Sequence, residues 1–144
     1  MDLLERARAL AACALFAELA PAVLIRLAER AHASELEAGE RRTTDDTVWV
    51  VATGSLAVVA RGEAALDSTA SSMKRHGGSA APGSVVGLIR VVAPGTPVVD
   101  AIADRPTTVL ALALDDMRDV LEEDPAALSA LAGALARLLL GASP

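Results

Sequence analysis

Residues 82–114 constrain the fold most, because turns and short strands alternate along the whole segment. A Pro82-Gly83 turn opens it, Gly87 interrupts the first apolar run, and a second turn spans residues 94–97. The run 88–92 between them is too short for an ordinary helix. The predicted strands of the segment, all rich in aliphatic and β-branched residues, are 84–86, 98–103 and 107–114.

The small residues around Gly87 permit two interpretations of this segment. A glycine-hinged half-turn between two strands lets a ligand approach backbone N–H groups, and adjacent amides favour a phosphate. The other interpretation is a tight turn that crosses an all-β core, because short Gly/Pro turns are common in β proteins. The shape of the segment alone leaves both open.

Composition narrows the class of protein. The chain has 144 residues, of which 53% are hydrophobic, so it is expected to form one domain (1–144) with a proper core. Phe16 and Trp49 are the only aromatic residues, so the core is predicted to be aliphatic. The net charge is −6 and no basic run exceeds Arg41-Arg42, which argues against binding of nucleic acid or of an anionic membrane surface.

The same sequence predicts a cytoplasmic protein. The single cysteine, Cys13, excludes an internal disulfide, and Asp2 and Glu5 stand where a signal peptide would be basic. No apolar run approaches the roughly 18 residues of a membrane span. The alanine-rich, lysine-poor composition is typical of a bacterium with a GC-rich genome.

Helical periodicity predicts two N-terminal helices within residues 1–32. Asp2 is expected to cap the first helix, and Pro21 suits the first position of the second. His32 is expected at the C-terminal end of the second helix, where the helix dipole explains a solvated histidine without a ligand.

Two further helices are predicted within residues 115–141, the first capped by Asp115 and the second beginning at Asp124-Pro125. The second helix carries a leucine stripe composed of Leu128, Leu131, Leu135 and Leu138. The stripe is either a face for a homodimer or a surface that packs within the chain.

Between the helices, residues 33–114 follow the period of a β-strand. The strands predicted before residue 62 are 34–37, 41–44, 47–53 and 55–61. Gly54 separates the last two and indicates a sharp corner or a hairpin. Residues 62–81 read as a loop with at most one short strand, near residues 73–76. Strands segregated from helices predict an α+β fold with a sandwich or roll.

Several motifs occur in an order that resembles one family. They are Leu15-Phe16 with Leu19, residues 24–31, Leu36 with Gly39-Glu40, residues 48–62, residues 82–87 and residues 97–125. Together they resemble a cyclic-nucleotide-binding domain, as in the catabolite activator protein and the protein kinase A regulatory subunit. Trp49 stands where this family usually has a tyrosine. The resemblance covers nearly the whole chain and implies an eight-stranded antiparallel, jelly-roll-like β-roll with N-terminal helices and two C-terminal helices.

The family's ligand-binding residues are replaced in this chain. In the family, a glutamate of the phosphate-binding cassette holds the ribose 2′-hydroxyl and an arginine pairs with the cyclic phosphate. Here Leu88 occupies the position of the glutamate and Gly95 that of the arginine, and the cassette is about two residues shorter. Losing one partner of a buried charged pair costs ~3–5 kcal/mol, roughly two to three decades of affinity or more.

The resemblance places a pocket at Val86, Gly87, Leu88, Ile89, Arg90, Gly95, Thr96, Pro97 and Val98. Arg90 is the best-placed substitute for the missing arginine, although a solvated side chain also explains it. The shortened cassette and a shortened hairpin before Trp49 both suggest a reduced or filled pocket.

Three functions remain open for the sequence. The first is a regulatory module that acts by protein contact, as a homodimer through the last helix or on a larger protein. The second is a sensor of cAMP, cGMP or another small ligand that uses Arg90 and backbone amides. The third is an enzyme of unknown chemistry, which is disfavoured. Neither His32 nor His76 has a cysteine or carboxylate at metal-ligand spacing, so neither a metal nor a catalytic group is expected. DNA binding is disfavoured too, because no helix-turn-helix follows the last helix.

Overall fold

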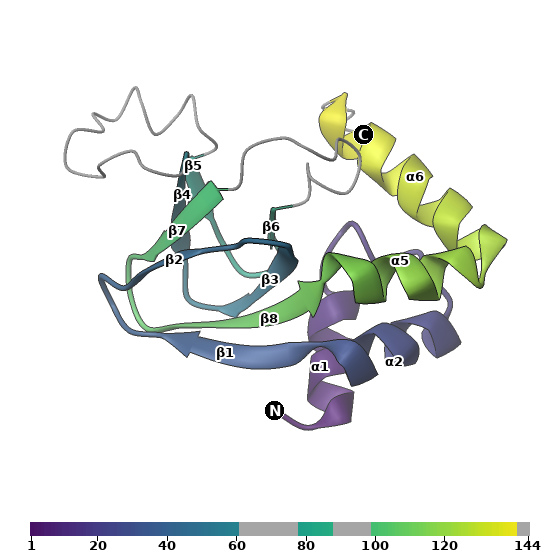
Figure 1. The fold of residues 1–144 in the computed structure, drawn as a ribbon, viewed down its shortest axis with the longest axis horizontal. Coiled ribbons are helices and arrows are strands. Elements are labelled where there is room, and N and C mark those ends of the chain that lie inside the picture. Colours follow the sequence, from purple (N-terminus) through teal and green to yellow (C-terminus); the bar gives the residue numbers. More distant parts are fainter. Residues whose placement is uncertain (61–77, 88–98, 141–144) are drawn as a thin grey trace.

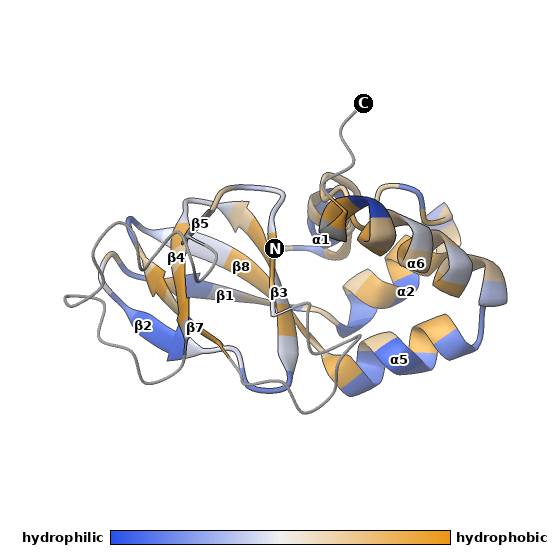
Figure 2. Ribbon diagram, turned by 90° about the horizontal axis from the view of Figure 1, so that it is seen from above, coloured by the Kyte–Doolittle hydropathy of each residue, from blue (hydrophilic) through white to orange (hydrophobic). Residues whose placement is uncertain are grey.

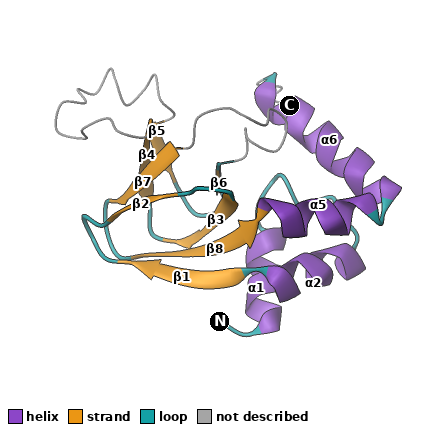
Figure 3. Cartoon of the chain, viewed as in Figure 1, coloured by secondary structure: helices purple, strands orange, loops and turns teal. Residues whose placement is uncertain are grey.

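In the computed structural model, residues 1–60, 78–87 and 99–140 are described. The strands gather at one end of the molecule and the helices at the other (Figure 1, Figure 3). The helices are α1 (Leu3–Ala11), α2 (Pro21–Arg30), α5 (Leu114–Glu122) and α6 (Pro125–Leu139). The strands are β1 (His32–Leu36), β2 (Arg41–Thr43), β3 (Thr47–Thr53), β4 (Leu56–Ala60), β5 (Gly78–Ala80), β6 (Val85–Val86), β7 (Val99–Ala103) and β8 (Thr107–Ala113).

The strands form two antiparallel sheets that face each other. The first sheet has the order β1-β8-β3-β6 and the second the order β2-β7-β4-β5. The chain crosses from β3 in the first sheet to β4 in the second at Gly54, which has a φ of +88°. Of the two predictions for this glycine, the corner is therefore confirmed and the hairpin is wrong.

Alternation along the strands produces two hydrophobic cores. One side of the first sheet faces the second sheet, and the interior cluster between them consists of Leu36, Trp49, Val51, Leu56, Ala80, Val86, Ala101, Ala103 and Val109. The other side of the first sheet presents Val48, Val50, Leu110 and Leu112 to the helices. Figure 2 shows the contrast between hydrophobic β4, which lines the interior, and hydrophilic β2 at the sheet edge. The central strands of the first sheet, β3 and β8, are thus buried on both sides.

Local signals placed three of the helix starts correctly. Asp2 and Glu5 form a capping box at α1, and Pro21 is the first residue of α2. Asp124 caps α6 by accepting hydrogen bonds from the backbone N–H groups of Ala126 and Ala127. The predicted α+β roll, with helices before and after the strands in the sequence, is confirmed.

Two boundaries predicted from the sequence are wrong. His32 is the first residue of β1 rather than a helix end, because α2 stops at Arg30 and His32 pairs with Ala111 on β8. Asp115 does not cap α5, which begins one residue earlier at Leu114 and has no side-chain cap. Helix α2 is followed almost at once by β1, and β8 is followed directly by α5.

The short strand expected near residues 73–76 lies outside the described residues, and the next described strand follows closely. Strand β5 occupies Gly78–Ala80 and pairs with β4, whereas residues 73–76 are outside the described part of the chain. None of the helices in the described part is long and apolar enough to cross a membrane.

Candidate functional site

The predicted pocket follows strand β6, and the structure describes its two flanks. Val86 and Gly87 lie at the first flank, and β7 begins at Val99 on the other side. The intervening cassette segment, residues 88–98, is outside the described residues. The predicted site residues that fall in it are Leu88, Ile89, Arg90, Gly95, Thr96, Pro97 and Val98.

Gly87 holds the first flank against the turn between β2 and β3. Its φ is +87°, a conformation that side-chain-bearing residues rarely adopt. A Cβ atom at this position would lie 2.8 Å from the backbone oxygen of Thr47 and 3.6 Å from the Thr44 hydroxyl. The sequence predicted a hinge glycine here, and the close approach to Thr47 gives the physical reason for it.

Thr44 holds the second flank. Its backbone N–H and its hydroxyl both donate to the carbonyl oxygen of Val99, over 3.0 and 3.1 Å. The Thr44 side chain is buried, with 1% of the residue exposed. Sequence reasoning missed this residue, because Val99 lies 55 positions away and no local motif marks the pair.

Trp49 lies in the roll interior beside the first flank. It is directly opposite Val86 on β6 and opposite Ala111 on β8, and only 5% of the residue is exposed. The residues that pack around it in the interior cluster are all aliphatic. This part of the interior therefore offers a ligand apolar contact and, among the described residues of the cluster, no charged group.

Among the described residues of the roll, the best-buried ion pair lies on the outer side of the second sheet. Asp100 Oδ2 accepts from Nε and Nη2 of Arg41, both over 2.8 Å. Its neighbours Val99 and Ala101 pack against the interior, so alternation places Asp100 on the opposite side. Asp100 Oδ1 is buried and accepts no hydrogen bond. This pair cannot supply the missing cation inside the roll.

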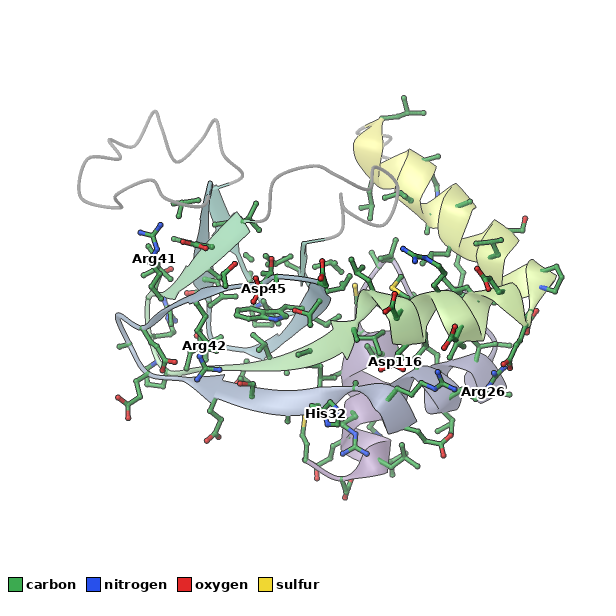
Figure 4. The ribbon with its side chains drawn as sticks, in the orientation of Figure 1. Arg26, His32, Arg41, Arg42, Asp45 and Asp116 are labelled. Atoms are coloured by element: carbon green, nitrogen blue, oxygen red, sulfur yellow. The ribbon has the colours of Figure 1, made fainter. Side chains whose placement is uncertain are left out.

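Arg42 links the two sheets at one side of the roll. Its guanidinium donates to Glu40, to the Ser34 hydroxyl over 2.6 Å and to the Glu35 backbone oxygen over 3.0 Å. It thereby joins the edge strand of one sheet to the edge strand of the other. Figure 4 shows Arg41 and Arg42 on the roll, well away from Arg26 and Asp116 on the helices.

The leucine stripe of α6 divides between the core and the surface. Leu131 and Leu135 are 4% and 8% exposed and belong to the helical core, so they pack within the chain and cannot form a dimer face. Leu128 and Leu138 are 50% and 51% exposed. The homodimer prediction therefore applies to these two residues only.

The described residues contain no cluster of three histidine, cysteine or acidic side chains that would hold a metal ion. Cys13 is buried, and burial raises the pKa of its thiol above the ordinary value. A neutral, buried thiol of this kind is a core residue rather than a nucleophile.

Solved structures share this fold. A cyclic nucleotide-binding-like protein from Brucella abortus matches with a TM-score of 0.57 and 24% identity, over 81% of this chain and 97% of that one. The N-terminal domain of a transcriptional regulator from Streptomyces coelicolor matches with a TM-score of 0.64 and 23% identity, over 97% and 92% of the two chains. A candidate cyclic nucleotide-binding protein from Geobacter metallireducens matches with a TM-score of 0.66 and 18% identity, over 88% and 89%.

No protein-family model matches the sequence, and neither does any curated protein. At these identities the solved structures establish a shared fold. The cyclic-nucleotide-binding-like fold expected from the order of the sequence motifs is confirmed.

Proposed function

We propose that this chain is a non-catalytic regulatory module that acts through protein contact and does not bind cAMP or cGMP in the manner of the family it resembles. The observation that carries the proposal is the apolar interior beside Val86, where Trp49 is buried among aliphatic side chains. In the sequence, Leu88 and Gly95 replace the glutamate and the arginine that the family uses. Without that glutamate and arginine, a cyclic phosphate would be buried with no charged partner among the described residues of the interior cluster, which is costly for an anion.

The helical end supplies a surface for the protein contact. Leu128, Leu138 and Leu140 of α6 and its C-cap are at least half exposed. A shallow groove of about 190 Å³ adjoins Leu128 and is lined by Leu114, Met117, Arg118, Leu121, Glu122 and Leu128. Exposed apolar side chains beside a groove are typical of a surface that meets another protein. The partner is a second copy of the chain or a larger regulated protein.

Isothermal titration calorimetry with cAMP and with cGMP up to millimolar concentration tests the proposal. The chain is expected to give no binding heat. The matched comparison is the double variant Leu88→Glu/Gly95→Arg, which restores the family's two recognition residues. A micromolar dissociation constant for the unmodified chain would contradict the proposal and favour the sensor.

The second candidate is a sensor of a cyclic nucleotide or other small ligand that uses Arg90 and the backbone amides of the cassette segment. The observation in its favour is Gly87, which matches the cassette glycine of the family in sequence and has a positive φ and close packing here. If the titration detects binding, Arg90→Ala separates the two mechanisms. The sensor requires a loss of affinity in this variant, and unchanged affinity would eliminate Arg90 as the phosphate partner.

A further inference from the structure

We propose that a trough on the first sheet docks a basic segment of another protein, one that carries apolar side chains as well. The lining residues of this feature, here called the sheet trough, include Met1, Glu5, Glu35, Glu37, Thr53 and Thr108. It consists of two adjoining hollows of about 570 and 320 Å³, which share Glu35, Thr53 and Thr108. None of its described lining residues belongs to the groove beside Leu128, so the inference adds a second surface to the proposed function.

The helices cover only part of the first sheet. Val50 on β3 and Leu110 on β8 lie opposite each other, pack against the helices, and are 1% and 0% exposed. Two residues away on the same side of β8, Thr108 lies between Glu35 on β1 and Thr53 on β3. The ends of β1 and β8 that carry this second row extend away from the helices (Figure 1). Because Glu35 and Thr53 are exposed, this row is open to a partner.

The sheet trough is acidic. The carboxylates of Glu5, Glu35 and Glu37 line it, and its described lining residues include no arginine or lysine. Among the ion pairs of the described residues, none involves these three carboxylates. Arg6, which follows Glu5 in the sequence, donates to two backbone oxygens instead. Charge complementarity therefore requires a partner that brings positive charge.

Exposed apolar side chains adjoin the acidic lining. Met1 lines the sheet trough and is 46% exposed. Leu3 and Leu4 are 36% and 55% exposed, and they lie in the same first turn of α1 as Glu5. Exposed apolar groups beside a hollow are typical of a surface that meets another protein. The partner segment is therefore expected to combine lysine or arginine with side chains such as leucine.

A second copy of the chain does not supply the matching charge. The net charge is −6, so two copies repel each other overall. Several arginines already form ion pairs within the described part of the chain, namely Arg26, Arg30, Arg41, Arg42, Arg118 and Arg137. Nucleic acid and anionic membranes are repelled by the same carboxylates. The occupant with matching chemistry is thus a basic segment of a different protein.

Amide NMR spectra of the full chain, titrated with a probe peptide, test the surface. The probe is an amidated peptide of leucine, lysine and serine, and two comparison peptides replace every lysine by glutamate or every leucine by serine. We expect the probe to shift the amide signals of Ala33, Glu35, Thr53 and Thr108. Each comparison peptide should bind about tenfold more weakly or less, because one lacks the positive charge and the other the apolar contacts.

The double variant Glu5→Gln/Glu35→Gln tests the charge of the sheet trough. Glutamine at position 5 keeps the capping box of α1, so the fold is retained. Binding of the probe should weaken roughly threefold to tenfold, since exposed ion pairs are individually weak. The matched control is Asp45→Asn/Asp115→Asn, which removes the same charge from exposed residues at the opposite end of β3 and β8 and should leave the affinity unchanged.

Three results would overturn the proposal. The first is the absence of any amide shift up to millimolar probe, and the second is an equal loss of affinity in the two double variants, which would mean that only net charge matters. The third is a dimer in sedimentation that Glu5→Gln/Glu35→Gln dissociates, because a second copy would then be the occupant. None of these measurements involves a nucleotide, so their outcome is independent of the calorimetric titration.

Discussion

Replacement of Gly54 by alanine is expected to be one of the most damaging single-methyl changes in the chain. A Cβ atom here would lie 2.4 Å from the Thr107 hydroxyl oxygen, 2.6 Å from the Pro106 oxygen and 2.7 Å from the Thr107 Cα. Two of these three atoms are backbone, so a side-chain rotation cannot relieve the overlap. The corner between the two sheets must open, or the β7–β8 turn must shift.

The magnitude follows from two contributions. Alanine at a φ of +88° costs about 1–2 kcal/mol. The displaced Thr107 hydroxyl accepts from the Ser55 N–H over 3.1 Å and lies within hydrogen-bond distance of the Arg105 oxygen, and losing these bonds costs about 0.5–1.5 kcal/mol each. The variant should lose about 2–5 kcal/mol, against a typical total stability of about 5–15 kcal/mol.

Gly39 provides a matched control. Its φ is +87°, but nothing lies within 4 Å of the position of a Cβ atom. Gly39→Ala therefore carries the backbone cost of about 1–2 kcal/mol without the overlap. The comparison isolates the effect of close packing at the corner.

Urea unfolding followed by the fluorescence of Trp49 measures both variants, because this buried residue is the only tryptophan. The midpoint should fall further for Gly54→Ala than for Gly39→Ala, with similar slopes. Equal midpoints would refute the reasoning, since they would mean that the corner accommodates a methyl group without loss of packing or hydrogen bonds.

Two further predictions concern the helical core. Because burial raises the pKa of Cys13 above its unfolded value, the thiol stabilises the fold fully below about pH 8.5, and this contribution declines as the pH rises toward the folded pKa. Urea midpoints measured between pH 7 and 10 should show a decline that Cys13→Ala lessens. Leu131→Ala should cost about 2–5 kcal/mol. Leu138→Ala should change stability by about 0.5 kcal/mol or less and instead weaken self-association in sedimentation, whereas equal costs for both leucines would contradict the division of the stripe.

The features predicted correctly from the sequence are those whose chemistry is local. The cap at Asp2 acts within the first helical turn, and Pro21 acts at its own position. The errors at His32 and Asp115 arise where a distant strand decides the boundary. Strand β8 pairs with β1 through residues 107–111 and leads directly into α5, and neither fact has a signal near the helix ends.

Among the residues of the candidate site, too, the sequence identifies those with local signals and misses those with distant partners. Gly87 was identifiable because glycine between two strand-like runs has a local conformational meaning. Thr44 was not, because a polar residue near a turn has many possible partners and its actual partner, Val99, lies far along the chain. In the sequence, Arg41-Arg42 indicates only that the basic character of the chain is limited. The two arginines have separate structural roles, because successive residues of β2 point to opposite sides. Arg41 pairs with Asp100 on β7, whereas Arg42 donates to Ser34 on the edge strand of the other sheet.

The first sheet contributes side chains to both hydrophobic cores, and this limits how a structural change in the roll can reach the helices. On β8, Val109 packs into the interior cluster while Leu110 and Leu112 pack against the helices. A change inside the roll could reach the helices through this strand only by repacking two dense cores at once, which is costly.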